Sequence, residues 1–274
     1  MGMTYAYRFQ RKFKNLLRKY ILNKEFVKRT KWGFLIKLDV SRDVDKHFYW
    51  GEFEFDTLKF YQNILKKGSI VFDIGANIGI YSLTASINIG DKGKVYSFEP
   101  SDWAYNRLIE NISLNKFKNV EYFKIGVSDK KGIVKFYKCA DDAYNSLGSR
   151  PMIDVKEIIE IEVDSLDHFC EERKIKKIDI LKIDAEGADY LVLKGAKKII
   201  NSDSPPVIFC EFNKGISEGY SFSKDDLLLL LKELSYSIYE IKRDGVIEFN
   251  PETSNSNEII CMKKEHLVKY GITG

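Results

Sequence analysis

The segment from Ser69 to Gly79, with the sequence SIVFDIGANIG, constrains the fold of this chain more than any other stretch. An apolar run, typical of a central parallel strand covered on both faces, ends in Asp73 and continues through a glycine-bearing turn into a helical pattern. Glycine allows backbone conformations and close approaches that a Cβ atom would block, and asparagine tolerates left-handed turns. Ligands of open α/β sheets bind beyond such strand ends, at a helix N-terminus. The segment therefore predicts a ligand-binding turn.

The residues around this turn indicate which ligand it binds. Gly75 and Gly79, with Asn77 between them, depart from the G-x-G-x-x-G spacing that cradles a dinucleotide pyrophosphate. Twenty residues after Gly79, the next predicted strand ends in Glu99, and an acid there can accept hydrogen bonds from both hydroxyls of a ribose. We therefore expect a nucleoside without phosphates, such as S-adenosylmethionine, with Asp73 and the turn holding its amino-acid half.

A third apolar run, from Ile178 to Asp184, also ends in acids before a helix, because Glu186 follows Asp184 closely. With these residues the chain resembles the FkbM family of S-adenosylmethionine-dependent methyltransferases. The resemblance covers about residues 51–262 and rests on FDIGANIGIYS (Phe72–Ser82), YSFEP (Tyr96–Pro100), NRLIENISLN (Asn106–Asn115), GVSDKKG (Gly126–Gly132), VDSLD (Val163–Asp167), LKIDAEGADYLVLKGA (Leu181–Ala196) and IFCEFN (Ile208–Asn213). The family often has a histidine shortly after the acid of the last segment, where this chain has Asn213.

The alternation of apolar runs with amphipathic stretches predicts an α/β protein with right-handed crossovers. The predicted strands are 69–74, 94–99, 120–127, 178–184, 207–211, 238–242 and 258–263. The family resemblance implies a Rossmann-like class I methyltransferase fold, with a seven-stranded, mostly parallel sheet ordered 3-2-1-4-5-7-6, strand seven antiparallel, and helices on both faces. Between strands three and four we predict a hairpin insertion, with its strands at 132–139 and 158–163.

Charge separates the N-terminus from the rest of the chain. Residues 1–31 hold ten Lys or Arg against one acid, Glu25, and apolar residues recur there at helical spacing. We expect a basic amphipathic N-terminal arm and lead-in over residues 1–50 and the methyltransferase domain over residues 51–274. The arm could pack its apolar stripe on the domain, which we favour, or contact an anionic membrane surface or a lipid-linked substrate. Nucleic acid is the least expected partner.

The chain has no run of 18 apolar residues, and its first residues lack the apolar core of a signal peptide. Its four cysteines, Cys139, Cys170, Cys210 and Cys261, are far apart and form no CxxC motif, which is typical of reduced thiols. These features predict a cytoplasmic protein, with peripheral contact at the inner membrane surface as an alternative.

The candidate catalytic residues are Asp184, Glu186 and Glu211, at the carboxyl ends of predicted strands four and five. A hydroxyl is a poor nucleophile near neutral pH, so an O-methyltransferase needs a base or a metal ion near the methyl group. The acids could instead cap a helix or order a turn. Magnesium bound by Asp184, Glu211 and Asn213 is an alternative, but we predict no metal site. His47 is a candidate lid residue.

The expected cofactor-binding residues lie at the ends of the first three predicted strands and are Asp73, Gly75, Ala76, Asn77, Gly79, Glu99, Pro100 and Ser128. Ser128 is expected to meet the adenine amine, and Trp103 or Val127 to cover a face of the base. The acceptor implied by the family is a sugar or another polar hydroxyl of a glycan or natural product.

Two other functions stay open. A nicotinamide-dependent oxidoreductase is disfavoured by Asn77 in the turn and by the lack of a second catalytic domain. A non-catalytic module that binds a nucleoside, recruited to a membrane or to nucleic acid, is the alternative outside enzymes.

Overall fold

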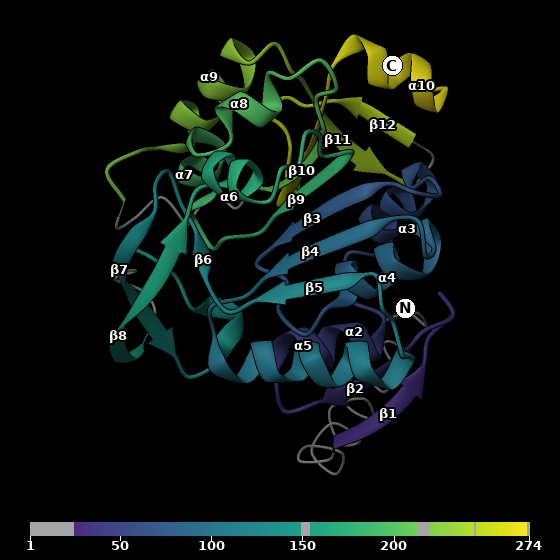
Figure 1. Ribbon diagram of the computed structural model, residues 1–274, viewed down its shortest axis with the longest axis vertical. Helices are drawn as coiled ribbons and strands as arrows, with labels where there is room; N and C mark the ends of the chain where they lie inside the picture. Colours follow the sequence, from purple (N-terminus) through teal and green to yellow (C-terminus); the bar gives the residue numbers. More distant parts are fainter. Residues whose placement is uncertain (1–24, 149–153, 213–219, 244, 273–274) are drawn as a thin grey trace, which may run out of the picture.

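A twisted sheet of eight strands forms the centre of the computed structural model, which describes residues 25–148, 154–212, 220–243 and 245–272 (Figure 1). The strands lie in the order β12-β11-β13-β10-β9-β3-β4-β5. Along the chain they are β3 (Ile70–Ile74), β4 (Lys94–Phe98), β5 (Val120–Phe123), β9 (Ile180–Ile183), β10 (Val207–Glu211), β11 (Ser237–Lys242), β12 (Gly245–Glu248) and β13 (Glu258–Met262).

The topology confirms the predicted strand order. Strands β3, β4, β5, β9 and β10 are parallel to their neighbours among these five, whereas β13 runs antiparallel to β10 and β11. The seven predicted strands therefore appear as 3-2-1-4-5-7-6. The edge strand β12 is an eighth member, which pairs antiparallel with β11.

Helices cover both faces of this sheet, and each face has its own apolar core. One face packs against α2 (Asp43–Trp50), α3 (Phe55–Ile64), α4 (Ile80–Ile89), α5 (Asp102–Asn115) and α10 (Lys264–Tyr270). The other packs against α6 (Leu166–Glu172), α7 (Asp189–Lys194), α8 (Lys197–Ile200) and α9 (Lys224–Glu233). Burial on both sides explains why the parallel strands read as continuous apolar runs.

The insertion between β5 and β9 forms a second, smaller sheet. Its strands β7 (Gly132–Cys139) and β8 (Val155–Asp164) pair antiparallel, which confirms the predicted hairpin, and the 3-10 turn η1 (Asp142–Tyr144) follows β7. The prediction of one continuous third strand over 120–127 was wrong. Strand β5 ends at Phe123 because its partner β4 ends at Phe98, and the chain then pairs with β8 instead, as β6 (Gly126–Val127).

The described part of the lead-in folds onto the main sheet's helical layer. Strands β1 (Glu25–Arg29) and β2 (Leu35–Asp39) form a hairpin, and α5 accepts hydrogen bonds from the β2 backbone through its Asn111 and Asn115 side chains, both at 2.7 Å. Phe34 of this segment is fully buried. The predicted apolar stripe of the arm, Phe9, Phe13, Leu16, Leu17, Tyr20 and Ile21, lies outside the described residues.

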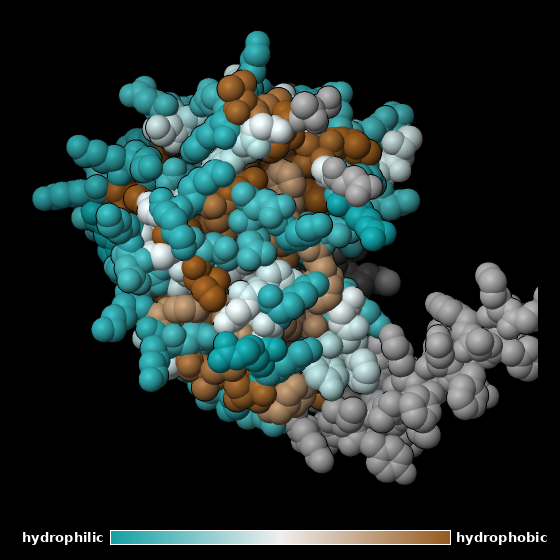
Figure 2. All heavy atoms as spheres, turned by 90° about the vertical axis from the view of Figure 1, so that its right-hand side faces the viewer, coloured by the Kyte–Doolittle hydropathy of each residue, from teal (hydrophilic) through white to brown (hydrophobic). Residues whose placement is uncertain are grey.

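The surface mixes polar and apolar residues. On the face shown in Figure 2, hydrophobic residues lie among hydrophilic ones. The most exposed large apolar side chains, Val268 and Ile133, belong to different elements, α10 and β7. Within the described residues, no helix has both the length and the apolar character needed to cross a bilayer.

Candidate functional site

A cavity of about 270 Å³ opens at the carboxyl ends of the parallel strands. The loops after β3, β4, β9 and β10 form its floor, and α2 and η1 contribute further walls. Eight of the eleven predicted site residues line it: Gly75, Ala76, Asn77, Glu99, Pro100, Asp184, Glu186 and Glu211. The candidate lid residue His47 lines it as well. The sheet thus brings residues from four separate sequence segments to one place.

The turn after β3 is shaped by close backbone contacts. The backbone N–H groups of Gly75 and Ala76 both donate to the Phe98 carbonyl at 2.9 Å, which wraps the turn over the end of β4. Gly75 has φ of 73°, and a Cβ atom there would lie 1.9 Å from the Asp184 carbonyl oxygen. Asn77 also adopts a left-handed conformation, with φ of 48°. Glycine is therefore required at position 75 because β9 approaches so closely.

Glu99 connects the turn to the second strand. Its Oε2 accepts a hydrogen bond from the Asn77 backbone at 2.8 Å, and its Oε1 accepts one from the Ser101 backbone at 2.9 Å. Burial raises the pKa of Glu99 to about 7. Each carboxylate oxygen keeps a further lone pair, so the group can still accept hydrogen bonds from two ligand hydroxyls in the cavity that it lines.

Asp73 does not line the cavity, contrary to the role expected for it. Its Oδ2 accepts a hydrogen bond from the Ser82 hydroxyl of α4 at 2.5 Å, and that hydroxyl lies 2.7 Å from the Ser97 hydroxyl of β4. The side chain is almost fully buried, and burial raises the pKa of Asp73 to about 6. Asp73 thus links β3 to α4 and β4, and it supports the turn from outside the cavity.

Gly79 and Ser128 also lie outside the cavity lining. A Cβ atom at Gly79 would lie 2.7 Å from Leu108 Cδ1, so this glycine lets α5 pack against the start of α4. Ser128 is buried and its backbone donates to Asp164, because this part of the predicted third strand belongs to the smaller sheet. Val127 lines the cavity in its place, and Trp103 instead stacks under the Arg42 guanidinium at 4.3 Å.

A buried ionic group lies behind the cavity wall. The Lys182 ammonium is 3.0 Å from Glu258 and 3.3 Å from Asp184. Although burial opposes its charge, these carboxylates raise the pKa of Lys182. Burial and the neighbouring Glu258 raise the pKa of Glu54, whose Oε2 accepts from the Tyr81 hydroxyl at 3.0 Å. Although burial opposes it, Lys182 and Glu54 lower the pKa of Glu258.

The three predicted catalytic acids meet at the cavity. One carboxylate oxygen from each of Asp184, Glu186 and Glu211 lies within 4.8 Å of the other two. Burial, together with the charges of Glu186 and Asp184, raises the pKa of Glu211 well above its usual range. The backbone of Glu186 is left-handed, with φ of 51°. Asp189 holds this loop by accepting from the backbone N–H groups of Ala185 and Gly187, both at 3.2 Å.

One wall of the cavity combines two segments that are about 100 residues apart. The Tyr144 hydroxyl of η1 donates to Asp43 of α2 at 2.8 Å, and Arg42 pairs with Asp142 at 2.9 Å. Three further residues that line the cavity, Glu54, Asp142 and Tyr144, were not expected from the sequence. The only signals were the acidic and aromatic segment around His47 and the polar run DDAYNSLGSR, neither of which has a fixed spacing from the turn.

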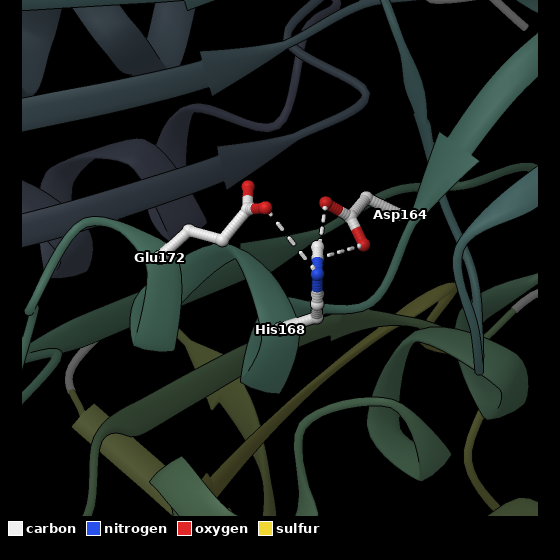
Figure 3. A group of neighbouring side chains, drawn as sticks. All are labelled: Asp164, His168 and Glu172. Carbon is white, nitrogen blue, oxygen red and sulfur yellow. Dashed lines mark hydrogen bonds and ion pairs between the residues drawn. The ribbon is translucent and has the colours of Figure 1, made fainter.

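A second cluster of acids and a histidine lies away from the cavity. Figure 3 shows the His168 ring between the carboxylates of Asp164 and Glu172. His168 Nδ1 lies 2.9 and 3.0 Å from the two Asp164 oxygens, and Nε2 lies 3.4 Å from Glu172. None of the three lines the cavity. Because both ring nitrogens already face a carboxylate, this cluster connects the start of α6 to the end of β8.

The chain is similar in sequence to known methyltransferases. The family described as the Methyltransferase FkbM domain matches residues 73–238, more than half of the chain. The hexuronic acid methyltransferase AglP of Haloferax volcanii is 26% identical over 195 residues, which are 70% of this chain and 74% of that protein. The 2-O-methyltransferase NoeI of Sinorhizobium fredii is 24% identical over 149 residues, which are 49% of this chain and 60% of that protein. A crystallised FkbM methyltransferase from Methylobacillus flagellatus is 17% identical with a TM-score of 0.45, over 75% of this chain and 50% of that one.

Proposed function

Because the chain belongs to the FkbM methyltransferase family, we propose that it transfers a methyl group from S-adenosylmethionine to a hydroxyl of a sugar or another polar acceptor, such as a glycan or natural product. The family membership makes the chain a methyltransferase that uses S-adenosylmethionine, which decides against the nicotinamide-dependent and non-catalytic alternatives. The hydroxyl acceptor is supported by the relatives, one a hexuronic acid methyltransferase and one a 2-O-methyltransferase.

The residues in the cavity fit this cofactor. Its ribose hydroxyls would be bound by Glu99, and its amino-acid half by the turn of Gly75, Ala76 and Asn77, beside Pro100. Asp73, Gly79 and Ser128 would act indirectly, by holding the turn, α4 and the neighbouring smaller sheet in place. When bound, the cofactor supplies an activated methyl carbon, so the protein mainly has to position the acceptor and remove its proton.

Proton removal is assigned to the three acids. Asp184 is the preferred base, because its side chain lines the cavity and is 35% exposed. Lys182 contacts Oδ2 of this carboxylate, so the other oxygen can accept a proton. Glu211 and Glu186 would hold the acceptor hydroxyl beside it. His47, which lines the cavity from α2, is a second candidate base. The single observation that carries the proposal is the meeting of Glu99, expected to bind the ribose, and this acid cluster in one cavity.

The test begins with cofactor binding. Isothermal titration should show that S-adenosylhomocysteine binds the full-length protein and NAD does not. A panel of neutral, amino and uronic sugars, free and in glycosides, is then incubated with the protein and S-adenosylmethionine labelled on its methyl group. Label in a sugar ether supports the proposal. Binding of NAD instead, or label on a nitrogen or carbon acceptor only, would refute it.

Recruitment to the acceptor is a second candidate role of the N-terminal arm, beside the packing of its apolar stripe on the domain. Ten basic residues against one acid in residues 1–31 would attract an anionic membrane surface or a lipid-linked glycan. Residues 1–24 are outside the described structure, so the support for this role is the sequence pattern.

A further inference from the structure

We propose that Asp184, Glu186 and Glu211 form a binding site for one divalent metal ion of the magnesium class, at the acceptor end of the cavity. The role of the ion in catalysis rests on the proposed function, whereas its binding can be tested without any methyl transfer. The sequence alone favoured no metal, and its magnesium alternative placed Asn213, which is not among the described residues, where the geometry places Glu186.

The spacing of the donor atoms suits a small, hard cation. One oxygen from each of the three carboxylates lies within 4.8 Å of the others. Magnesium binds oxygen at about 2.0–2.1 Å and calcium at about 2.3–2.6 Å, so ligand oxygens on opposite sides of the ion are about 4–5 Å apart. Small rotations of the side chains would therefore bring all three into contact with one ion. Carboxylates are also the ligands that these cations, and manganese, prefer.

An unpartnered buried oxygen is the independent observation that points to a ligand. Oε2 of Glu211 is buried without a hydrogen-bond partner in the structure, although the side chain lines the cavity. Burying a carboxylate oxygen without a partner is unfavourable, and proteins avoid it by adding a proton or a cation. A cation held jointly with Asp184 and Glu186 would satisfy this oxygen.

The local charge balance leaves room for a cation. Lys182 is a buried ammonium in contact with Asp184, and it is paired with Glu258 at 3.0 Å. Its contact with Asp184, at 3.3 Å, occupies one of the two oxygens of that carboxylate. Asp189, which accepts hydrogen bonds from the backbone of this loop, adds a further carboxylate beside it. The charges of Glu186, Asp184 and Asp189 thus act on Glu211 against the charge of Lys182.

In the cluster of Asp164, His168 and Glu172, by contrast, the polar groups are paired with one another. Both ring nitrogens of His168 lie against carboxylates, and Asp164 Oδ1 also accepts the Ser165 backbone N–H at 2.8 Å (Figure 3). This cluster supplies the same number of candidate ligand groups, so it serves as the matched control. We expect it to bind no ion.

A divalent ion bound by these acids would act on the acceptor hydroxyl. It would lower the pKa of an acceptor hydroxyl in contact with it and fix that oxygen beside the methyl group. In that case the acids act as ligands rather than as the base, and the acceptor proton would pass to His47, the second candidate base.

Manganese is the probe, because the signal of free Mn²⁺ in electron paramagnetic resonance disappears on binding. Full-length protein without cofactor is titrated, and one saturable site that Mg²⁺ displaces is expected. Glu211→Gln and Asp184→Asn should weaken Mn²⁺ binding at least tenfold, and the control variants His168→Ala and Asp164→Asn should leave it unchanged. Glu186→Gln, on a surface loop, is the replacement variant if Glu211→Gln does not fold.

Four outcomes would overturn the site. These are the absence of saturable binding at millimolar Mn²⁺, unchanged binding in Glu211→Gln and Asp184→Asn, loss of binding in His168→Ala, and release of Mn²⁺ by saturating S-adenosylhomocysteine. The last would assign the acids to the ammonium group of the cofactor. Binding of S-adenosylhomocysteine without Mn²⁺ binding refutes the metal site alone, whereas Mn²⁺ binding without S-adenosylhomocysteine binding refutes the cofactor assignment alone.

Discussion

The two ends of the cavity are built differently. At the end assigned to the cofactor, the turn after β3 and Glu99 satisfy one another, since backbone N–H groups occupy both oxygens of that carboxylate. At the end assigned to the acceptor, acids from different strands converge, and Oε2 of Glu211 has no partner in the structure. One end is thus organised before any ligand arrives, and the other depends on a proton, a cation or an acceptor to complete it. Binding of cofactor and chemistry on the acceptor should therefore be separable by mutation.

The largest effect is expected at the acceptor end. Asp184→Asn should lower kcat by about 10²–10⁴-fold, because a base or ligand contributes only to the chemical step. Binding of S-adenosylhomocysteine should change by less than about threefold, since the partners of Glu99 are untouched. The measurements are steady-state kinetics and isothermal titration on the same preparation. Equal losses in turnover and in affinity for S-adenosylhomocysteine would show that cofactor binding and the chemical step cannot be separated by mutation.

The next effect is expected at the cofactor end. Glu99→Ala removes the acceptor of two ribose hydroxyls and should cost about 1.5–3 kcal/mol, which is roughly tenfold or more in affinity for S-adenosylhomocysteine. Glu160→Ala, an exposed acid on β8, is the matched control and should bind normally. If the folded Glu99→Ala protein binds as tightly as the wild type, Glu99 is not the ribose ligand.

Stability should also depend on pH through Glu99. Burial raises the pKa of Glu99 to about 7, above the ordinary value of 4.5, so the folded state binds a proton more tightly than the unfolded state between these values. Its contribution is therefore largest below about pH 4.5 and is lost as the pH rises through 7. The free energy of unfolding should fall by about 2 kcal/mol from pH 5 to pH 7 on account of this group.

Denaturant unfolding of the wild type and Glu99→Gln at both pH values checks this contribution, because the amide keeps the shape and cannot ionise. Burial also raises the pKa of Asp73 to about 6, so Asp73 lowers the free energy of unfolding with rising pH in both proteins. The contribution of Glu99 is therefore the difference in this pH dependence between the wild type and Glu99→Gln. Identical slopes for the two proteins would contradict the assignment to Glu99.

The smallest effect on the cavity is expected from the arm. Deleting residues 1–24 leaves the β1–β2 hairpin intact, so turnover on a small soluble acceptor should change by less than about twofold. If the arm contacts membranes, flotation with anionic liposomes should be lost on deletion and weakened by salt, because exposed charges are screened over about 8 Å at physiological ionic strength. Equal flotation of both forms, or of neither, would remove the arm as a membrane contact. A large loss of thermal stability would instead support packing of its apolar stripe.

Local sequence was sufficient for much of the fold and for several residues at the end of the cavity that we assign to the cofactor. The apolar runs, the helix start at Ser223, and the acids at strand ends are short-range signals, and parallel strands bring their carboxyl ends to one edge of the sheet. The turn from Gly75 to Asn77 could be identified because left-handed backbone needs glycine or asparagine. The same reasoning expected Asp73 at the ligand, whereas its side chain is not among the residues that line the cavity, because a strand pattern does not show which helix a buried carboxylate meets.

The tertiary structure decided the acceptor end. Glu54 reaches the cavity from the N-cap of α3, and Asp142 and Tyr144 reach it from the insertion. At the acceptor end, Glu186 joins Asp184 and Glu211 through a left-handed loop. These residues come from four segments between positions 54 and 211, and no periodicity encodes such separations. The identity of the acids could therefore be read from the sequence. Their arrangement follows from the tertiary structure, in which Asp184 after β9 and Glu258 of β13 share Lys182, while Oε2 of Glu211 in β10 is buried without a partner.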